Sequence, residues 1–230
     1  LVLARTDKTE KSHKGLSLFM VEKPSCESDE FEFSQDSGGR MTGKAIKTLG
    51  YRGMHSFEMS YTDFFVPEEN LIGGDTGLNR GFYYTMKGFL NGRLQTAARA
   101  CGLMRSAYES TRAFATDRSI FNKKLVDHPL TLRKIADMAG LISASRTYTL
   151  DVAQKMEQGG GALDANLVKL FACQSAERVA RDALQLHGGM GYAQETEVSR
   201  HFVDAKVLSI FEGTEETLAV RVVGREMMAN

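Results

Sequence analysis

The sequence predicts an α+β chain that is mainly α, with a β portion in residues 1–75 followed by about four helices in residues 76–230. Before residue 75, apolar residues come in short, aromatic-rich runs bounded by turn-forming residues, which is typical of strands. After residue 78, apolar residues recur at three- and four-residue steps over long stretches, which is typical of amphipathic helices.

In the β portion, the sequence indicates one strand at residues 15–23 and another at 57–66, which alternates over part of its length. The opening run LVLAR reads as a strand entered midway, so we expect part of the natural protein to precede Leu1. Residues 26–43 are rich in acids, Ser and Gly and are expected to form a loop. Pro67 cannot donate to a strand ladder, so the β portion is expected to end soon after it.

The first two helices have clear limits in the sequence. An amphipathic stripe predicts a helix from about residue 78 to Thr116. Pro129 suits the first turn of a second helix. This second helix is expected to run to about Glu157, because three glycines follow at 159–161.

Two further helices complete the expected bundle. Asp164 is expected to cap a third helix that ends near His187. A fourth helix is expected to start near Thr214, and the pattern allows a shorter one at 195–201. Four helices are enough for a bundle.

Composition and charge exclude several classes of function. Lys plus Arg and Asp plus Glu both number 29, so the formal net charge is zero, whereas a general nucleic-acid binder needs a cationic excess. No apolar run approaches the roughly 20 residues of a membrane span. The three cysteines are widely spaced and the five histidines show no ligand-type pairing. We therefore expect reduced cysteines in a cytoplasm-like compartment and no metal site.

The stretch FEGT places Glu212 just before Gly213 and Thr214, at the expected start of the last helix. A carboxylate on a loop that faces an apolar pocket is a plausible general base, because loss of water makes it a better proton acceptor. Thr214 can cap the helix, and a helix N-terminus can hold an anion. Equally, Glu212 can be a surface residue that the helix dipole favours.

Three other stretches also have two interpretations each. The glycine-rich segment 185–192 follows a helix and allows either close approach to a ligand or a simple helix C-cap. The segment 118–129 places cations around Phe121, which suits a phosphate on a planar ring system or a solvated basic loop. Arg93 lies on or beside the apolar stripe of the first helix and needs a partner, either an acid or a ligand phosphate.

Together and in this order, these stretches resemble the acyl-CoA dehydrogenases over essentially the whole chain. The specific motifs are RSIF near position 120, QLHGGMG near 188 and DAKVLSIFEGTEE at 204–216. The resemblance implies that residues 1–75 are the end of that family's middle β domain, a remnant of a barrel-like fold. Residues 76–230 would then be its C-terminal four-helix bundle, and an N-terminal helical domain would precede Leu1.

By this resemblance, the activity would be dehydrogenation of an acyl-CoA thioester to a trans-2-enoyl-CoA. Glu212 matches the base that removes the α-proton, while the β-hydrogen leaves as hydride to FAD. The electron acceptor would be electron-transferring flavoprotein, and the protein a homodimer or homotetramer in the cytoplasm, or in the mitochondrial matrix of a eukaryote. An acyl-CoA oxidase and a catalytically inactive helical interaction protein of the same fold remain open as alternatives.

The resemblance also implies which residues contact the cofactor and the substrate. Those implied to bind FAD are Arg118, Ser119, Ile120, Phe121, His128, Gln185, Gly188, Gly189, Thr214, Glu215 and Glu216. The Arg118 to Phe121 stretch is implied to reach FAD across a subunit interface. Arg93 and Gly213 are implied to lie near the acyl-CoA.

The sequence departs from the family pattern at four positions. Asn122 stands where Gly usually follows the RSIF motif, and Pro129 stands where Gln is common. Leu90 stands where some members carry an acid, so no substrate-binding acid is assigned to it. A few relatives carry the base immediately before the arginine; here that residue is Gly92, which favours Glu212 as the sole base.

Overall fold

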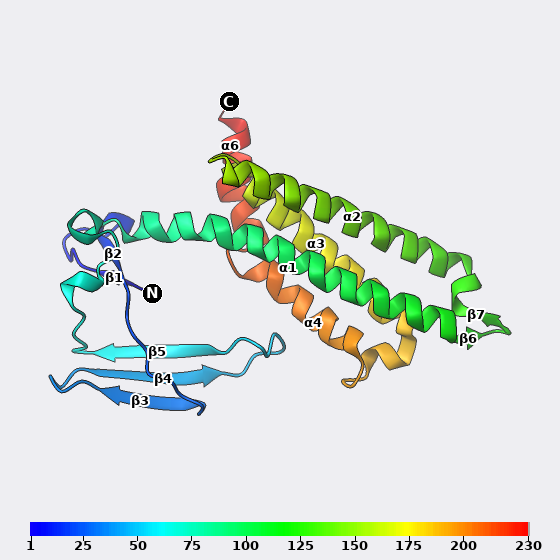
Figure 1. Ribbon diagram of the computed structural model, residues 1–230, viewed down its shortest axis with the longest axis horizontal. Coiled ribbons are helices and arrows are strands. Elements are labelled where there is room, and N and C mark those ends of the chain that lie inside the picture. The colour runs from blue at the N-terminus through cyan, green and yellow to red at the C-terminus, as the bar shows by residue number, and fades with distance from the viewer. Residues whose placement is uncertain (230) are drawn as a thin grey trace. The chain divides into compact units, whose positions relative to one another are not determined.

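The computed structural model describes residues 1–229. The chain divides into two compact units, one from Leu1 to Phe89 and the other from Leu90 onward. The regular structure of the first unit is mainly strands and short 3₁₀ turns, whereas helices make up most of the second (Figure 1). The chain is therefore mainly α, as the sequence predicts.

The first unit contains two small antiparallel sheets. Strand β1 (Val2–Arg5) pairs with β2 (Leu16–Phe19). Strands β3 (Glu30–Ser34), β4 (Arg40–Ile46) and β5 (Ser56–Thr62) form a second sheet in that order. Neither of these described sheets closes into a barrel.

The predicted loop over residues 26–43 is wrong, because β3 and the start of β4 lie within it. Phe31 and Phe33 alternate with acidic residues, which is a strand pattern that the high acid content of this stretch obscures. Gly43 of β4 accommodates the ring of Phe31 on β3, since a Cβ at Gly43 would lie 2.1 Å from that ring. The two predicted strands are also shorter than expected, as β2 ends at Phe19 and β5 at Thr62.

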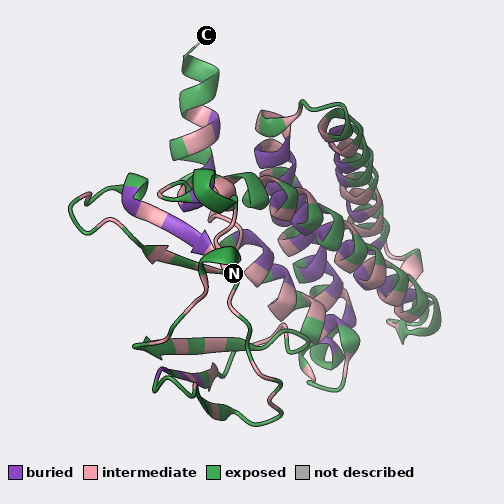
Figure 2. Ribbon diagram, turned by 60° about the vertical axis from the view of Figure 1, so that its left-hand side comes forward, coloured by how far each residue is buried: buried purple, intermediate pink, exposed green. Residues whose placement is uncertain are grey.

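The second unit is built on four long helices. These are α1 (Gly81–Asp117), α2 (Pro129–Glu157), α3 (Ala162–His187) and α4 (Glu197–Ile210). Helix α3 packs against both α2 and α4. It has 13 buried residues, against five in α2, so the core of the unit lies around α3. Figure 2 shows this burial on the inward faces of the helices.

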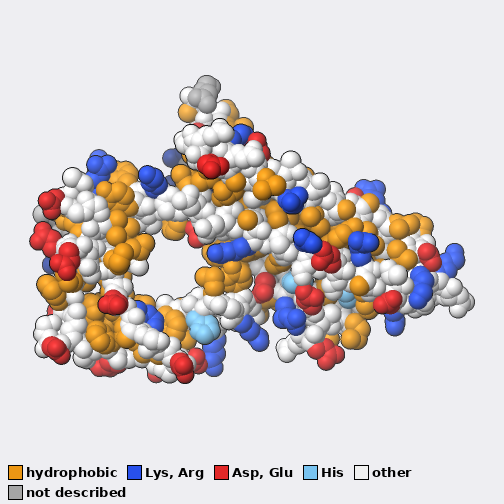
Figure 3. All heavy atoms as spheres, in the orientation of Figure 1, with side chains coloured by type: hydrophobic (Ala, Val, Ile, Leu, Met, Phe, Trp, Pro, Cys, Tyr) orange, Lys and Arg blue, Asp and Glu red, His pale blue; other side chains and the backbone are white. Residues whose placement is uncertain are grey.

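Short side chains line the buried faces of α1 and α3. Ala97, Ala100 and Ala107 are fully buried on α1, and Ala172 and Ala176 are fully buried on α3. Apolar side chains are also exposed on the surface of this unit (Figure 3).

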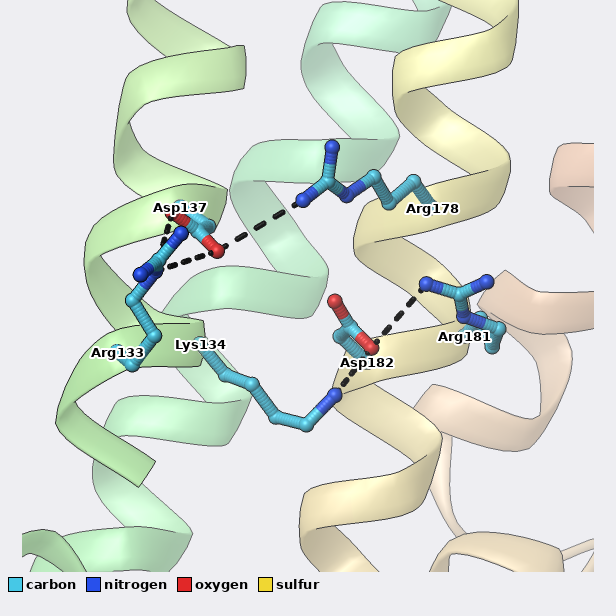
Figure 4. A network of polar contacts seen from close by, with 6 residues as sticks. All are labelled: Arg133, Lys134, Asp137, Arg178, Arg181 and Asp182. Atoms are coloured by element: carbon cyan, nitrogen blue, oxygen red, sulfur yellow. Dashed lines mark hydrogen bonds and ion pairs between the residues drawn. The ribbon is translucent and has the colours of Figure 1, made fainter. Parts of the chain in front are cut away.

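Ion pairs join α2 to α3 along one edge of the bundle (Figure 4). Lys134 of α2 pairs with Asp182 of α3, and Asp137 of α2 pairs with Arg178 of α3. The Asp182 side chain is 8% exposed, so its pairing with Lys134 offsets the desolvation of a nearly buried carboxylate. This network adds charged contacts to the packing of α2 on α3.

Two helix predictions need correction. Helix α3 begins at Ala162 and is capped by Gly161, whose φ of 73° closes the preceding turn, so Asp164 lies in the first turn and not at the cap. The short helix expected at 195–201 is the 14-residue α4, which continues because Ala205 and Leu208 stay on the buried face. The predicted start at Thr214 is confirmed: its side chain accepts a hydrogen bond from the Thr217 amide.

The chain after Thr214 is helical as far as residue 228. It consists of α5 (Glu215–Thr217), a π-helical stretch (Leu218–Val223) and α6 (Gly224–Met228). Leu218 and Val223 are buried and anchor this segment. The segment holds the loop that precedes it against the body of the helical unit.

Candidate active site

The loop between α4 and α5, residues 211–214, has an unusual backbone conformation. Glu212 has a φ of 57° and Gly213 a φ of 100°. The left-handed conformation is uncommon for a residue with a Cβ and costs about 1–2 kcal/mol. Surrounding contacts must therefore hold this loop, which we call the base loop, in place.

Arg93 of α1 supplies one of these contacts. Its Nε donates to the Glu212 carbonyl oxygen at 3.1 Å, and its Nη1 donates to Asn166 Oδ1 at 2.7 Å. Asn166 in turn donates from Nδ2 to the Ala162 carbonyl oxygen at 2.8 Å, which fixes the direction of its amide. Arg93 is only 8% exposed. Burial lowers the pKa of its guanidinium, and the charge of Glu212 opposes that effect.

Lys169 of α3 supplies the second contact. Its side chain is fully buried, and its Nζ donates to the Gly213 carbonyl oxygen at 2.8 Å. Asn166 and Lys169 are three residues apart, so they share one face of α3. Two consecutive carbonyl groups of the base loop are thus each bound by a buried cation, one from α1 and one from α3.

The Glu212 carboxylate lies directly over Gly92 of α1. A Cβ built at Gly92 would be 2.5 Å from Glu212 Oε2 and 2.7 Å from its Cδ, so only glycine leaves room for this carboxylate. Oε2 is buried, and no hydrogen-bond partner reaches it among the described residues. A buried carboxylate oxygen without a donor is uncommon and is free to accept a proton.

The structure brings several predicted site residues to this end of the helical unit. Arg93, Gly213, Thr214 and Glu215 all lie on or beside the base loop. Glu215 accepts from Gln174 Nε2 at 3.2 Å through Oε2, while its Oε1 is buried without a partner among the described residues. Glu216 is exposed, and hydrogen bonds from its own amide and from Thr214 lower its pKa.

A second group of predicted residues lies where α1 ends. Strands β6 (Ser119–Ile120) and β7 (Lys123–Lys124) form a small hairpin immediately after Asp117. Phe121 and Asn122 make its two-residue turn with φ values of 47° and 61°, so Asn122 adopts the conformation that glycine would favour. Phe121 is 88% exposed. His128 Nε2 lies 3.4 Å from the Ile120 carbonyl oxygen, which places it against the hairpin.

The segment from Gln185 to Gly189 is at this same end. It contains the C-terminal end of α3 at His187 and the C-cap residue Gly188, which has a φ of 59°. The ring of His187 stacks on Phe114 of α1 at a centroid distance of 4.3 Å. Because Phe114 is three residues before Asp117, this contact ties the glycine-rich segment to the end of α1 that leads into the hairpin.

The two groups lie far apart within one chain. Gly92 and Asp117 are separated by 25 residues of a single helix, which is about 37 Å at 1.5 Å per residue. The base loop and the hairpin of one copy of the chain therefore cannot contribute to the same small binding site.

Sequence reasoning missed Asn166 and Lys169. The signal was present, because both are polar residues on the apolar face of α3 that carries Ala165 and Val168. A Lys or Asn on such a face is seldom buried without a specific partner. What the pattern could not supply was the identity of that partner.

The fold and this arrangement define a helical domain with a buried carboxylate oxygen on a strained loop, and comparison with known families gives its identity. The family described as "Acyl-CoA dehydrogenase, C-terminal domain" matches residues 79–228. The chain belongs to the acyl-CoA dehydrogenase family.

Individual relatives agree with this assignment. The (2S)-methylsuccinyl-CoA dehydrogenase of Cereibacter sphaeroides is 39% identical over 229 residues, which cover 99% of this chain and 40% of that protein. A caffeyl-CoA reductase-Etf complex subunit of Acetobacterium woodii is 29% identical, over 97% of this chain and 55% of that protein. The chain thus spans about half the length of the curated relatives that it matches.

Solved structures show the same relation. The butyryl-CoA dehydrogenase of Megasphaera elsdenii superposes with a TM-score of 0.86 and 30% identity, over 98% of this chain and 55% of that one. The predicted family and fold class are confirmed. Among residues 1–229, no helix has both the length and the hydropathy needed to cross a membrane.

Proposed function

We propose that the complete protein containing this chain dehydrogenates an acyl-CoA thioester to a trans-2-enoyl-CoA, with Glu212 as the base. The observation that carries the proposal is the buried, unpartnered Oε2 of Glu212, on a loop that Arg93 and Lys169 hold by its carbonyl groups. Such an oxygen is ready to receive a proton and has no competing donor to displace.

The chemistry needs this kind of group. The α-C–H bond of a thioester is weakly acidic, so its cleavage requires a positioned carboxylate and exclusion of water. Glu212 takes the α-proton on its carboxylate. FAD, when bound, supplies the acceptor for the β-hydrogen, which leaves with its electron pair as hydride. Gly213, beside the base, lies near the thioester. Arg93 lies on the substrate side of the site and holds the base loop through the Glu212 carbonyl group.

The two separated groups of residues fit FAD when they come from two copies. Thr214, Glu215 and Glu216 at the base loop would hold the cofactor near Glu212. The hairpin group of a second copy would complete the site through these residues: Arg118, Ser119, Ile120, Phe121, His128, Gln185, Gly188 and Gly189. An exposed aromatic ring beside a cation suits a planar ring system that carries phosphates. A homodimer or homotetramer follows from this division.

Further parts of the proposal rest on the family. Residues 1–75 are assigned to the end of the middle β domain and residues 76–230 to the C-terminal helical domain. Electron-transferring flavoprotein is the proposed electron acceptor, supported by the relative that belongs to an Etf complex. The proposed location is the cytoplasm, or the mitochondrial matrix in a eukaryote.

The test compares Glu212→Gln with the unchanged complete protein, each mixed anaerobically with a panel of acyl-CoAs while the flavin absorbance is followed. Glutamine keeps the shape but cannot accept the proton, so flavin reduction should slow by about 10²- to 10⁴-fold while FAD stays bound. Glu226→Gln makes the same change at an exposed position of α6 and should leave the rate unchanged. Rapid flavin reduction in Glu212→Gln would refute the role of Glu212, and fast reoxidation by oxygen would indicate an oxidase.

A further inference from the structure

Lys169 is the largest fully buried side chain of the chain's described part. It lies in the N-terminal third of α3, among buried residues that include Asn166, Val168 and Ala172. Long cationic side chains normally place the charged group in water. A fully buried lysine side chain therefore indicates a specific structural or functional role.

The surroundings of Lys169 offer little compensation for its charge. Within residues 1–229 no carboxylate lies within 4.0 Å of its Nζ, so it has no ion pair. Burial lowers the pKa of its ammonium, the nearby charge of Arg93 adds to that effect, and the charges of Glu215 and Glu212 partly oppose it. Its hydrogen bond goes to the Gly213 carbonyl oxygen, at 2.8 Å. Burial of the Lys169 ammonium costs free energy, and the hydrogen bond that this buried group makes is to the base loop.

The base loop is held from three directions. Arg93 binds the Glu212 carbonyl, Lys169 binds the Gly213 carbonyl, and the Thr214 side chain accepts from the Thr217 amide. On its other side Gly213 packs against Leu218, because a Cβ built there would lie 3.1 Å from Leu218 Cδ2. Without Lys169, the Gly213 peptide would lose its donor and the left-handed conformations of the loop would be less well fixed.

We propose that Lys169 is a positioning residue, whose buried ammonium fixes the Gly213 peptide and thereby keeps the Glu212 carboxylate over Gly92. The proposal rests on the proposed function of Glu212 for its effect on catalysis, but its structural part does not. Lys169 contacts the loop backbone and acts on the reaction only through Glu212.

The test uses Lys169→Met in the complete, FAD-loaded protein. Methionine has nearly the same length but cannot donate, so the base loop should loosen. Hydrogen exchange of the amides in residues 211–218 should accelerate at least tenfold, while exchange in α2 stays unchanged. Lys155→Met removes an exposed lysine of α2 that pairs with Asp151 and Asp164, and should leave exchange in residues 211–218 unchanged.

Stopped-flow reduction by an acyl-CoA gives a second readout. Lys169→Met should lower the limiting rate constant of flavin reduction at least tenfold, with the substrate dissociation constant changed less than threefold. A merely structural role would instead reduce the amplitude of bleaching, because fewer molecules would be folded, and would leave the rate constant of the folded fraction intact. A normal rate constant with normal exchange would overturn the proposal.

Two outcomes separate this proposal from the function itself. If no acyl-CoA reduces the unchanged protein, the proposed function fails, and hydrogen exchange alone decides whether Lys169 holds the loop. If Lys169→Met does not fold, Lys169→Gln replaces it: the shorter amide should show the same faster exchange in 211–218. Failure of both variants to fold would make Lys169 a general stability residue and overturn the positioning role.

Discussion

The two ends of the helical unit are built in opposite ways. At the end with Glu212, charged side chains are buried and hold the backbone of a strained loop. At the end with the hairpin, a large aromatic side chain, Phe121, is 88% exposed on a two-residue turn. Both ends carry residues that the family resemblance assigns to one cofactor.

Under the proposed function, this contrast divides the chemistry between the two ends. The base end supplies positional accuracy, since Arg93 and Lys169 each hold a neighbouring carbonyl of the base loop. Under the proposed function, the hairpin end supplies an exposed aromatic ring to which FAD binds. Changes at the base end should therefore alter rates, and changes at the hairpin end should alter the binding of FAD.

Among substitutions that leave Glu212 itself in place, the largest effect is expected from Gly92→Ala. Its Cβ would lie 2.5 Å from Glu212 Oε2, so the carboxylate must move. A displacement of about 1 Å at a reacting group can lower a rate about 10²-fold. The limiting rate of flavin reduction in the complete protein should fall by about that factor, with FAD content unchanged.

Gly102→Ala is the matched control on the same helix. No atom lies within 4 Å of a Cβ built at Gly102. Replacing an exposed helical glycine by alanine should stabilise the protein by about 0.5–1 kcal/mol without changing the rate. Equal rates for both variants would mean that the Glu212 carboxylate is not confined as the structure indicates.

The main features of the fold could be predicted because local signals agreed with it. Pro129 and the glycines at 159–161 set the limits of α2 that the structure has. The strand β3 was missed because its acids and serines dominate the composition of the stretch, although Phe31 and Phe33 alternate correctly. Helix α4 was underestimated because Asp204 and Lys206 interrupt its apolar pattern, while burial against α3 sustains the helix.

The candidate site was only partly predictable. Glu212 and Arg93 could each be singled out from local context, but their contact joins residues 119 positions apart. Lys169 illustrates the limit more clearly, because its partner is a backbone carbonyl and leaves no trace in residue types. Periodicity shows which face of a helix is buried, but it does not show which loop that face meets.

A smaller effect is expected at the hairpin end from Phe121→Ala. The side chain is so exposed that the stability of the fold should change by less than about 0.5 kcal/mol. Stacking of an aromatic ring on a nucleotide base is worth about 1–3 kcal/mol, so FAD should bind about tenfold more weakly. Ultrafiltration of the complete protein at graded FAD concentrations measures this, and Phe121→Tyr should bind FAD normally. An unchanged FAD affinity in Phe121→Ala would remove this side chain from the cofactor site.

The smallest effect concerns stability and lies away from both ends. Ser106 of α1 donates to Glu197 Oε1 of α4 at 2.7 Å, and His201 Nε2 lies 3.0 Å from each of them. The pKa of Glu197 is lowered from 4.5, the ordinary value for a glutamate, and the hydrogen bond from Ser106 is the largest cause. Since the folded-state pKa is lowered, the stabilisation is complete above pH 4.5 and is lost as the pH falls through the folded-state value.

Ser106→Ala should therefore destabilise the complete protein by about 1 kcal/mol at pH 7, the usual worth of one hydrogen bond. The difference from the unchanged protein should shrink as the medium is acidified, because Glu197 becomes protonated in both. Urea unfolding at a series of pH values measures this, with Ser110→Ala on the same helix as the control. A destabilisation that stays constant across the acid range would mean that Ser106 acts through packing of α1 on α4 and not through the charge of Glu197.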